Sequence, residues 1–241
     1  MVDNYWALLD LIAPRRCRFC GADSLYREVF VAGRASFDCG ICAACYRALP
    51  WNRPHCPRCA LPQVHAAPCA RCARRPPPFA TVWAPLRLEA PVQQAVHALK
   101  YRAAFGDAAW LAALFASTLT RREAPLPELL LPVPLHRGRL CRRGYNQSVE
   151  LARALARRSG IAVASNGARR LRATADQIGT SAAARRRNVR GAFAVDAVVA
   201  GKHVALLDDV MTTGATLAEL TRAALAAGAL SVEAWAIARV A

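Results

Sequence analysis

The residues best suited to chemistry in this sequence form one short segment, residues 204–216, in which two acids precede a threonine-rich turn. The segment VALLDDVMTTGAT is an apolar run that ends in Asp208 and Asp209, and its turn leads into an alanine-rich stretch. The run has strand length and does not alternate, as expected of a strand buried on both faces of a parallel sheet. The two acids would then lie at the carboxyl end of that strand, where open α/β sheets bind ligands.

The turn after the acids contains groups that bind phosphate. Backbone N–H groups and hydroxyls at a helix N-terminus suit a phosphate, and here they belong to Thr212, Thr213, Gly214, Ala215 and Thr216. Adjacent carboxylates beside such a turn indicate a phosphorylated sugar, because they can accept hydrogen bonds from neighbouring ribose hydroxyls. The turn lacks the Gly-Lys-Ser/Thr ending of a Walker A loop. The alternative is an ordinary strand–turn–helix with an acidic surface turn.

The order of these residues resembles the phosphoribosyl-pyrophosphate (PRPP) loop of type I phosphoribosyltransferases. In that loop hydrophobic residues, two acids and a T-T-G-x-T turn follow one another. The resemblance implies that Asp208 and Asp209 meet the ribose hydroxyls and that residues 212–216 hold the 5′-phosphate.

Composition favours a partner rich in phosphate. The 241 residues carry a formal net charge of +17, and Lys100 and Lys202 are the only lysines beside a large number of arginines. Such a balance raises affinity for phosphate groups and for nucleic acid. A GC-rich genome would also produce an Ala- and Arg-rich chain, and the arginines are spread along the sequence rather than gathered in one block.

No segment of the sequence suggests a membrane span or a secretory signal. No apolar stretch reaches the roughly 18 residues of a membrane-spanning helix, and the first residues carry Asp3 and Asp10 without a basic region. We therefore expect a cytoplasmic protein. In that compartment cysteines are metal ligands or free thiols more often than disulfides.

The cysteines indicate structural zinc. Nine of the ten lie between Cys17 and Cys72, and two C-x-x-C pairs complete one tetrahedral Cys₄ site. Four pairs therefore predict two zinc ions, held by Cys17, Cys20, Cys42, Cys45, Cys56, Cys59, Cys69 and Cys72. Successive ribbons are the simplest pairing, but spacing also allows an interleaved one, and Cys39, His55 or His65 could replace a ligand. Gly21 can adopt the positive φ of a tight metal knuckle, whereas Ala60 in the matching place is less suited to it.

Three prolines, at 76–78, suggest a boundary between two domains. We expect an N-terminal helix and double zinc-ribbon module over 1–76, and a domain of alternating strands and helices over 79–241. The expected strands are 79–88, 129–134, 161–165, 203–208 and 231–239, and the expected helices 89–100, 106–121, 146–158 and 215–227. This alternation predicts a mostly parallel sheet with helices on both faces.

Two basic segments of this domain could contact a charged ligand. An arginine-rich loop follows the strand that ends at Pro134, and guanidinium groups pair bidentately with phosphate oxygens. Such a loop suits a diphosphate, and the candidate contacts in it are Arg137, Arg143, Gly144 and Asn146. The polar segment 172–193 is expected to form a lid that excludes water. A solvated loop is the simpler alternative for either segment.

Taken together, the motifs resemble the ComF family. They are the N-terminal C-x-x-C pairs, the Lys100-Tyr101 step, P-V-P with R-G-Y-N-Q, T-x-x-Q with R-x-x-N, and L-D-D-V-x-T-T-G-x-T, in this order. The resemblance implies a zinc module joined to a type I phosphoribosyltransferase-like fold, PRPP with Mg²⁺ as ligand, and Lys100 at the site. It also implies a role in DNA uptake during natural transformation, with single-stranded DNA and an uptake helicase or other competence proteins as partners. Thr180 departs from the family, which usually has leucine there.

Three functions are compatible with these features. The first is an enzyme that transfers phosphoribose from PRPP to an acceptor, although no base-recognition element follows Val232. The second is an adaptor for nucleic acid or a helicase that retains the PRPP site. The third is a PRPP-responsive regulator, for which no recognition helix is evident. The sequence does not decide whether turnover occurs.

Overall fold

The computed structural model describes residues 16–22, 39–172 and 189–241, and these form two compact units, Met1–Leu49 and Pro50–Ala241. The boundary between these two compact units falls inside the cysteine-rich segment. Residues 50–76 belong to the unit that contains the sheet. Backbone hydrogen bonds explain this, because Asn52 N–H donates to Pro85 O at 2.8 Å and Arg87 N–H to Pro50 O at 2.7 Å.

The first unit contains one short described helix and half of the cysteine pairs. Helix α2 (Ala43–Arg47) begins after Cys42, whose sulfur accepts a hydrogen bond from Cys45 N–H. The knuckle that starts at Cys17 closes when Gly21 N–H donates to Cys17 O at 2.9 Å, and Gly21 has a φ of 70°. The positive φ expected at Gly21 is thus confirmed.

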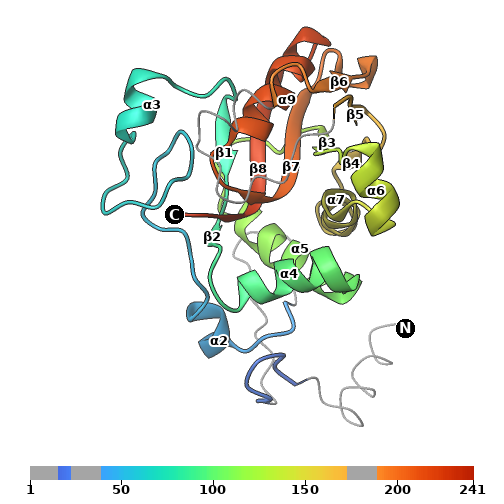
Figure 1. Cartoon of the computed structure of the whole chain (residues 1–241). Helices are drawn as coiled ribbons and strands as arrows, with labels where there is room; N and C mark the ends of the chain where they lie inside the picture. The colour runs from blue at the N-terminus through green and yellow to red at the C-terminus, as the bar shows by residue number, and fades with distance from the viewer. Residues whose placement is uncertain (1–15, 23–38, 173–188) are drawn as a thin grey trace, which may run out of the picture. The chain divides into compact units, whose positions relative to one another are not determined.

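The second unit is built on a parallel sheet (Figure 1). Its main strands follow the order β1 (Thr81–Trp83), β8 (Ser231–Arg239), β7 (His203–Met211), β3 (Leu129–Pro132), β4 (Ala162–Val163), and β2 (Leu86–Arg87) also pairs with β8. Every pair among these described strands is parallel. The strand expected over 79–88 is divided in two around Pro85, because proline cannot donate to a ladder.

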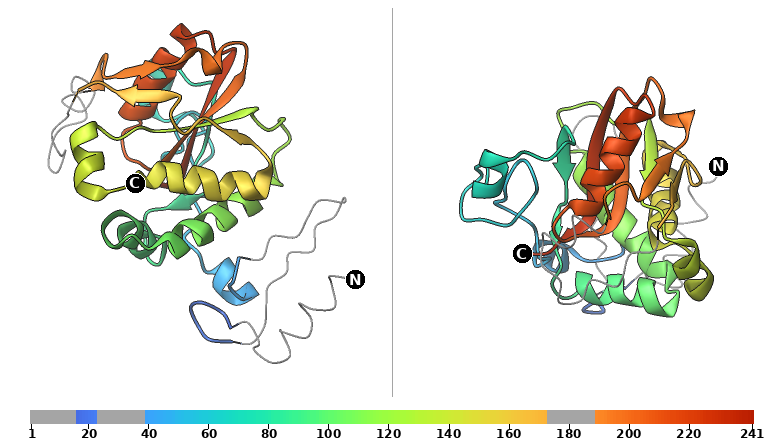
Figure 2. Two further views of the ribbon diagram at one scale, coloured as in Figure 1. Left: turned by 90° about the vertical axis from the view of Figure 1, so that its right-hand side faces the viewer. Right: turned by 45° about the horizontal axis from the view of Figure 1, so that its top comes forward.

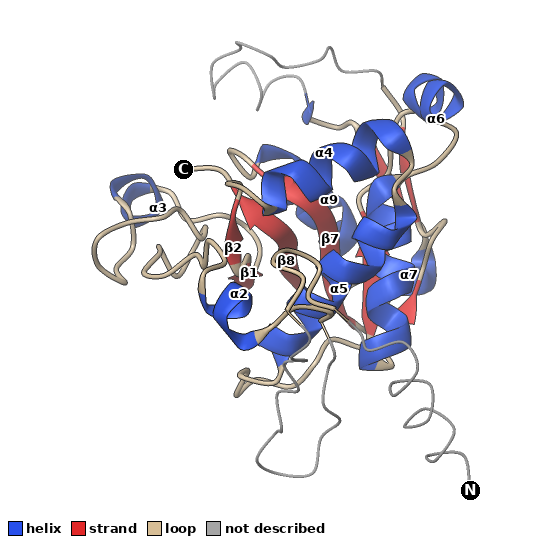
Figure 3. Ribbon diagram, turned by 90° about the horizontal axis from the view of Figure 1, so that it is seen from below, coloured by secondary structure: helices blue, strands red, loops and turns tan. Residues whose placement is uncertain are grey.

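Helices cover both faces of this sheet, as the sequence predicted. Ala234 and Ala236 of β8 share a core cluster with Leu217 of α9 (Ala215–Ala226). Trp235 points to the opposite face, because side chains alternate along a strand, and its ring lies 5.3 Å from that of Phe115 in α5 (Phe105–Leu119). Helices α4 (Val92–Arg102) and α7 (Gln147–Ser159) lie on the same side as α5 (Figures 2 and 3).

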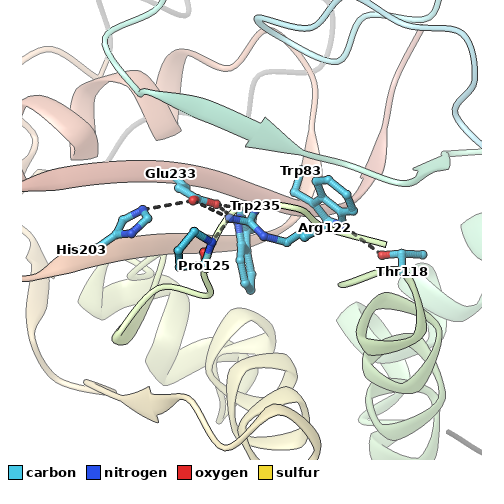
Figure 4. A network of polar contacts seen from close by, with 7 residues as sticks. All are labelled: Trp83, Thr118, Arg122, Pro125, His203, Glu233 and Trp235. Carbon is cyan, nitrogen blue, oxygen red and sulfur yellow. Dashed lines mark hydrogen bonds and ion pairs between the residues drawn. The ribbon is translucent and has the colours of Figure 1, made fainter. Parts of the chain in front are cut away.

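A buried ion pair fixes the amino end of the sheet (Figure 4). Arg122 donates to both carboxylate oxygens of Glu233 at 2.8 Å, and the two side chains are 4% and 3% exposed. Trp235 Nε1 and His203 Nε2 contact the same carboxylate at 2.7 and 3.0 Å. These contacts satisfy the buried carboxylate, which would otherwise be costly to desolvate. The network is far along β8 from its carboxyl end, where ligands are expected.

Several described elements were not predicted from the sequence. They are α3 (Ala70–Arg74), α6 (Arg137–Arg143), the antiparallel pair β5 (Ala168–Arg170) and β6 (Phe193–Val195), and the short 3₁₀ helix η1 (Ala197–Val199). Most of the expected lid, including Thr180, lies outside the described residues. Among the helices that are described, none has the length and apolarity to cross a membrane.

Candidate functional site

The two acids lie at a step in the sheet. Strand β7 pairs with β3 only as far as Leu207, which lies opposite Pro132, but it pairs with β8 as far as Met211. The strand thus extends beyond the expected end at 208. Asp208 and Asp209 therefore follow the point where β3 has ended, and one edge of β7 is open beside them.

Both carboxylates have partners from other elements. Lys100 Nζ, near the end of α4, lies 2.5 Å from Asp209 Oδ2, and Asp209 is 3% exposed. Ser148 Oγ, in the first turn of α7, donates to Asp208 Oδ1 at 3.1 Å. The sequence predicted Lys100 at the site only through the family resemblance. Ser148 was not predicted, since nothing in its local pattern distinguishes it.

The acid pair has an unusual protonation equilibrium. Burial and the neighbouring charge of Asp209 raise the pKa of Asp208 to about 7, although Lys100 opposes this shift. Burial would lower the pKa of Lys100, but the attraction of Asp209 outweighs it and the pKa is raised. Asp208 can consequently gain or lose a proton near neutral pH while Lys100 remains charged.

The arginine-rich segment is a helix and not the expected loop. Helix α6 begins after His136, whose Nδ1 accepts from Gly138 N–H, and it ends at Gly144, which has a φ of 80°. Asn146 then caps α7: its Oδ1 accepts from Ser148 N–H at 3.0 Å and its Nδ2 donates to Val133 O at 3.0 Å. Gly144 and Asn146 thus shape the backbone around the site.

A cavity of about 910 Å³ joins these elements. It is lined by both acids, by Ser148, by Thr212 and Thr216 of the turn, and by six cationic side chains, Lys100, Arg102, Arg139, Arg142, Arg143 and Arg170. Arg137 is not among the lining residues. The helix explains the difference, because positions 139, 142 and 143 share one face of α6 and residue 137 does not.

The turn that follows the acids starts helix α9. Gly214 is the N-cap with a φ of 74°, and Ala215 N–H donates to Thr213 Oγ1 at 3.3 Å. Thr212 and Thr216 line the cavity, whereas the three residues between them form the turn itself. The carbonyl of Thr213 accepts a hydrogen bond from Arg71 Nη1 at 3.0 Å. No local pattern in the sequence indicates that contact, which joins residues 142 positions apart.

The cysteine pairs form two groups of four in sequence order. One comprises Cys17, Cys20, Cys42 and Cys45, the other Cys56, Cys59, Cys69 and Cys72, and the sulfur atoms of each group lie within 4.8 Å of one another. The distance between the sulfur atoms of Cys20 and Cys42 is 3.6 Å, and that between the sulfur atoms of Cys59 and Cys69 is 3.8 Å. A zinc tetrahedron with bonds of about 2.3 Å has edges of roughly 3.8 Å. Both groups therefore fit structural zinc, and the successive pairing is confirmed.

Backbone N–H groups favour the thiolate of the leading cysteine in each group. Burial opposes ionisation of Cys17, but hydrogen bonds from the backbone of Cys20, Cys42 and Phe19 lower its pKa to about 6. The corresponding Cys56 has its pKa lowered to about 7 in the same way. Among the described residues, Cys39, His55 and His65 belong to neither group.

Comparison with known proteins agrees with this architecture. Residues 8–73 match the double zinc ribbon domain. The DNA utilization protein YhgH of Salmonella typhi is 40% identical over 205 residues, which cover 83% of this chain and 90% of that protein. YhgH of Escherichia coli K12 is 37% identical with the same coverage, and competence protein F of Haemophilus influenzae is 31% identical over 213 residues.

A solved structure with partial similarity is the Bacillus subtilis glutamine PRPP amidotransferase in complex with ADP and GMP. It is 23% identical, the match covers 54% of this chain and 26% of that one, and the TM-score is 0.36. The fold and the cysteine groups define the class, a parallel α/β domain joined to a double zinc ribbon. Within that class, its similarity to YhgH and competence protein F shows that the chain belongs to the ComF family.

Proposed function

We propose that the cavity at the end of β7 binds PRPP or a related ribose phosphate. The observation that carries this proposal is the convergence of Asp208, Asp209 and the Thr212–Thr216 turn with six cationic side chains on one cavity. Carboxylates accept hydrogen bonds from ribose hydroxyls, and a helix N-terminus favours a phosphate. The arginines of α6 face the side of the cavity where a diphosphate would be neutralised.

Different residues of the cavity would contact different parts of such a ligand. Asp208 and Asp209 orient the ribose, Thr212 and Thr216 contact the 5′-phosphate, and Arg139, Arg142 and Arg143 contact the diphosphate. Lys100 holds the Asp209 side chain in place through their ion pair. Mg²⁺, when bound with PRPP, supplies further charge neutralisation on the diphosphate, and the carboxylate oxygens suit that hard cation.

Calorimetry with PRPP and Mg²⁺ tests the proposal. Replacement of both acids, Asp208→Asn with Asp209→Asn, is expected to weaken binding at least about 100-fold, since hydrogen bonds to charged groups are the strong ones. Asp196→Asn is the matched control, because Asp196 is an exposed acid that pairs with Arg169. Equal affinity of the double variant and the control would contradict the ribose assignment.

We further propose that the protein handles incoming single-stranded DNA during natural transformation, in the cytoplasm and together with an uptake helicase or another competence protein. Support comes from the names of its relatives, DNA utilization protein and competence protein F, and from the net charge of +17. Binding that rests on phosphate contacts weakens steeply with salt. A titration of single-stranded DNA at several salt concentrations tests this role, and an absent or flat response would remove it.

A second candidate function is turnover, in which phosphoribose is transferred from PRPP to an acceptor. The size of the cavity favours it, because about 910 Å³ is near the upper end for small-molecule sites. PRPP consumption, screened against nucleobases and single-stranded DNA, distinguishes this enzyme from an adaptor that only binds. Binding without consumption for any acceptor would support the adaptor.

A further inference from the structure

We propose that the second cysteine group, Cys56/Cys59/Cys69/Cys72, positions the phosphate-binding turn through Arg71 and Arg239. In this view the second ribbon is part of the ligand site, although it contributes no residue to the cavity lining. The proposal rests on the proposed function for its ligand. The geometry of the turn itself can be tested without any ligand.

Arg71 connects the cysteine group to the turn directly. It lies between Cys69 and Cys72, in α3, and its Nη1 donates to Thr213 O at 3.0 Å. The same guanidinium also interacts with the side chains of Cys59 and Cys72. Four thiolates around a divalent ion leave a net charge of −2. The loaded group therefore holds Arg71 in place, and Arg71 holds the turn.

Arg239 makes a second connection, from the last residue of β8. Its side chain is 3% exposed, and Nε donates to Cys59 O at 3.0 Å while Nη1 donates to Met211 O at 3.1 Å. Met211 ends β7 and directly precedes Thr212 of the turn. One buried guanidinium thus joins the knuckle of the ribbon to the strand that carries both acids.

Apolar packing makes the connection stiff. Cys56, Cys59, Cys69 and Cys72 belong to the same core cluster as Met211 and Leu217, which flank the turn on either side. Asn52, which is fully buried, donates from Nδ2 to Ala60 O and to Ala84 O, both at 2.9 Å. The ribbon is consequently packed against the sheet domain and also hydrogen-bonded to it.

The decisive experiment compares two arginines of the same short helix. Arg71→Gln removes the donor to Thr213, whereas Arg74→Gln removes an exposed arginine of α3 with the same change in charge. Each variant is prepared as the full chain with its zinc content measured. Amide hydrogen exchange of residues 212–216 is followed without ligand, and calorimetry then gives the affinity for PRPP with Mg²⁺.

For Arg71→Gln we expect two zinc ions per chain, faster exchange in 212–216 and affinity reduced about tenfold, the scale of one charge-assisted hydrogen bond. Arg74→Gln should match the wild type in zinc content, in exchange of residues 212–216 and in affinity for PRPP. Equal exchange in the two variants, with zinc retained, would overturn the inference. If the wild type binds no PRPP, the proposed function fails, and the exchange comparison alone still decides whether the ribbon orders the turn.

Should Arg71→Gln lose zinc, Arg71→Lys provides the second variant. Lysine keeps the positive charge beside the thiolates, but a single ammonium cannot replace the planar fork that serves sulfur atoms and a carbonyl together. Zinc should be retained and exchange in 212–216 should rise by a smaller factor than expected for glutamine. Exchange identical to that of the wild type would contradict the proposed connection.

Discussion

The two cysteine groups have the same local design and very different surroundings. In each group the knuckle closes through an equivalent backbone hydrogen bond: Gly21 N–H donates to Cys17 O, and Ala60 N–H donates to Cys56 O. The sulfur of the leading cysteine accepts from a backbone N–H at 3.3 Å in both groups. Yet Cys20 is exposed, whereas all four cysteines of the second group are buried.

The difference teaches that identical metal motifs can serve different purposes in one chain. The first group holds together the short described segments of its own unit. The second shares the core of the sheet, and buried polar side chains, Asn52 and Arg239, donate to carbonyls of its knuckle. We therefore expect loss of the second group to affect the whole unit Pro50–Ala241, and loss of the first to have local effects.

The largest expected effect follows from Cys59→Ser. Structural zinc sites contribute about 10 kcal/mol or more in isolated zinc-finger peptides, and the second group is part of the core, so the unit Pro50–Ala241 should lose its cooperative unfolding transition. Cys20→Ser, the matched change in the first group, should leave that transition in place. Calorimetric melting of both variants, with zinc content, provides the measurement; similar melting curves would break the distinction between the groups.

The second largest effect is expected from Arg239→Gln. This change leaves the buried Cys59 carbonyl without its donor and removes one of the donors to the Met211 carbonyl, which keeps its bond from Val240 N–H. We expect a loss of about 2 kcal/mol in the free energy of unfolding. Arg222→Gln, at an exposed arginine of α9 that pairs with Glu219, should change it by less than about 0.5 kcal/mol. Urea denaturation measures both. A small effect at Arg239 would mean that its hydrogen bonds contribute little to holding the ribbon.

A smaller effect should come from the knuckles. Gly21 and Ala60 have φ values of 70° and 54°, and a side chain in this region costs about 1 kcal/mol. Gly21→Ala should therefore weaken zinc retention in the first group by a few-fold in a chelator competition. Ala60→Gly should not raise zinc retention in the second group above that of the wild type. The strain of a positive φ is removed, but the loss of a buried methyl group offsets this gain. A large loss in either variant would contradict this comparison.

The most gradual effect concerns pH. The pKa of Asp208 is raised to about 7 from an ordinary value of 3.8, so the folded state holds its proton more tightly than the unfolded state. This contribution to stability is complete below pH 3.8 and is lost as the pH rises to about 7. The unfolding free energy of the wild type minus that of Asp208→Asn should decline from pH 5 to 8. A difference that rises with pH would mean that folding lowers the pKa of Asp208 rather than raising it.

Much of the architecture could be predicted from local patterns. The zinc ligands follow from pair spacing, and the strands near 129–134, 203–208 and 231–239 follow from unbroken apolar runs that end at turns. The acids and the turn of α9 are contiguous in sequence. Their arrangement could therefore be predicted without knowledge of the tertiary structure.

What the sequence did not reveal depends on contacts between distant residues or on a missed helix. Arg139 would have been found had the His136 and Gly144 caps been taken as helix ends, since 139, 142 and 143 then share a face. Arg71 and Arg239 have no local pattern that indicates their partners. The packing of residues 50–76 with the sheet could not be predicted either, because it depends on hydrogen bonds from Asn52 to residues far along the chain.

The bond between Arg239 and Cys59 also has a consequence for the order of events during synthesis. Its partners are 180 residues apart. A ribosome adding about 5–20 residues per second therefore completes the cysteine group, which ends at Cys72, roughly 8 to 32 seconds before it reaches β8. The four thiols can bind their ion in that interval, because they lie close together in sequence. The metal is then in place before the strand that secures it, and the last described strand docks onto a ribbon that is already formed.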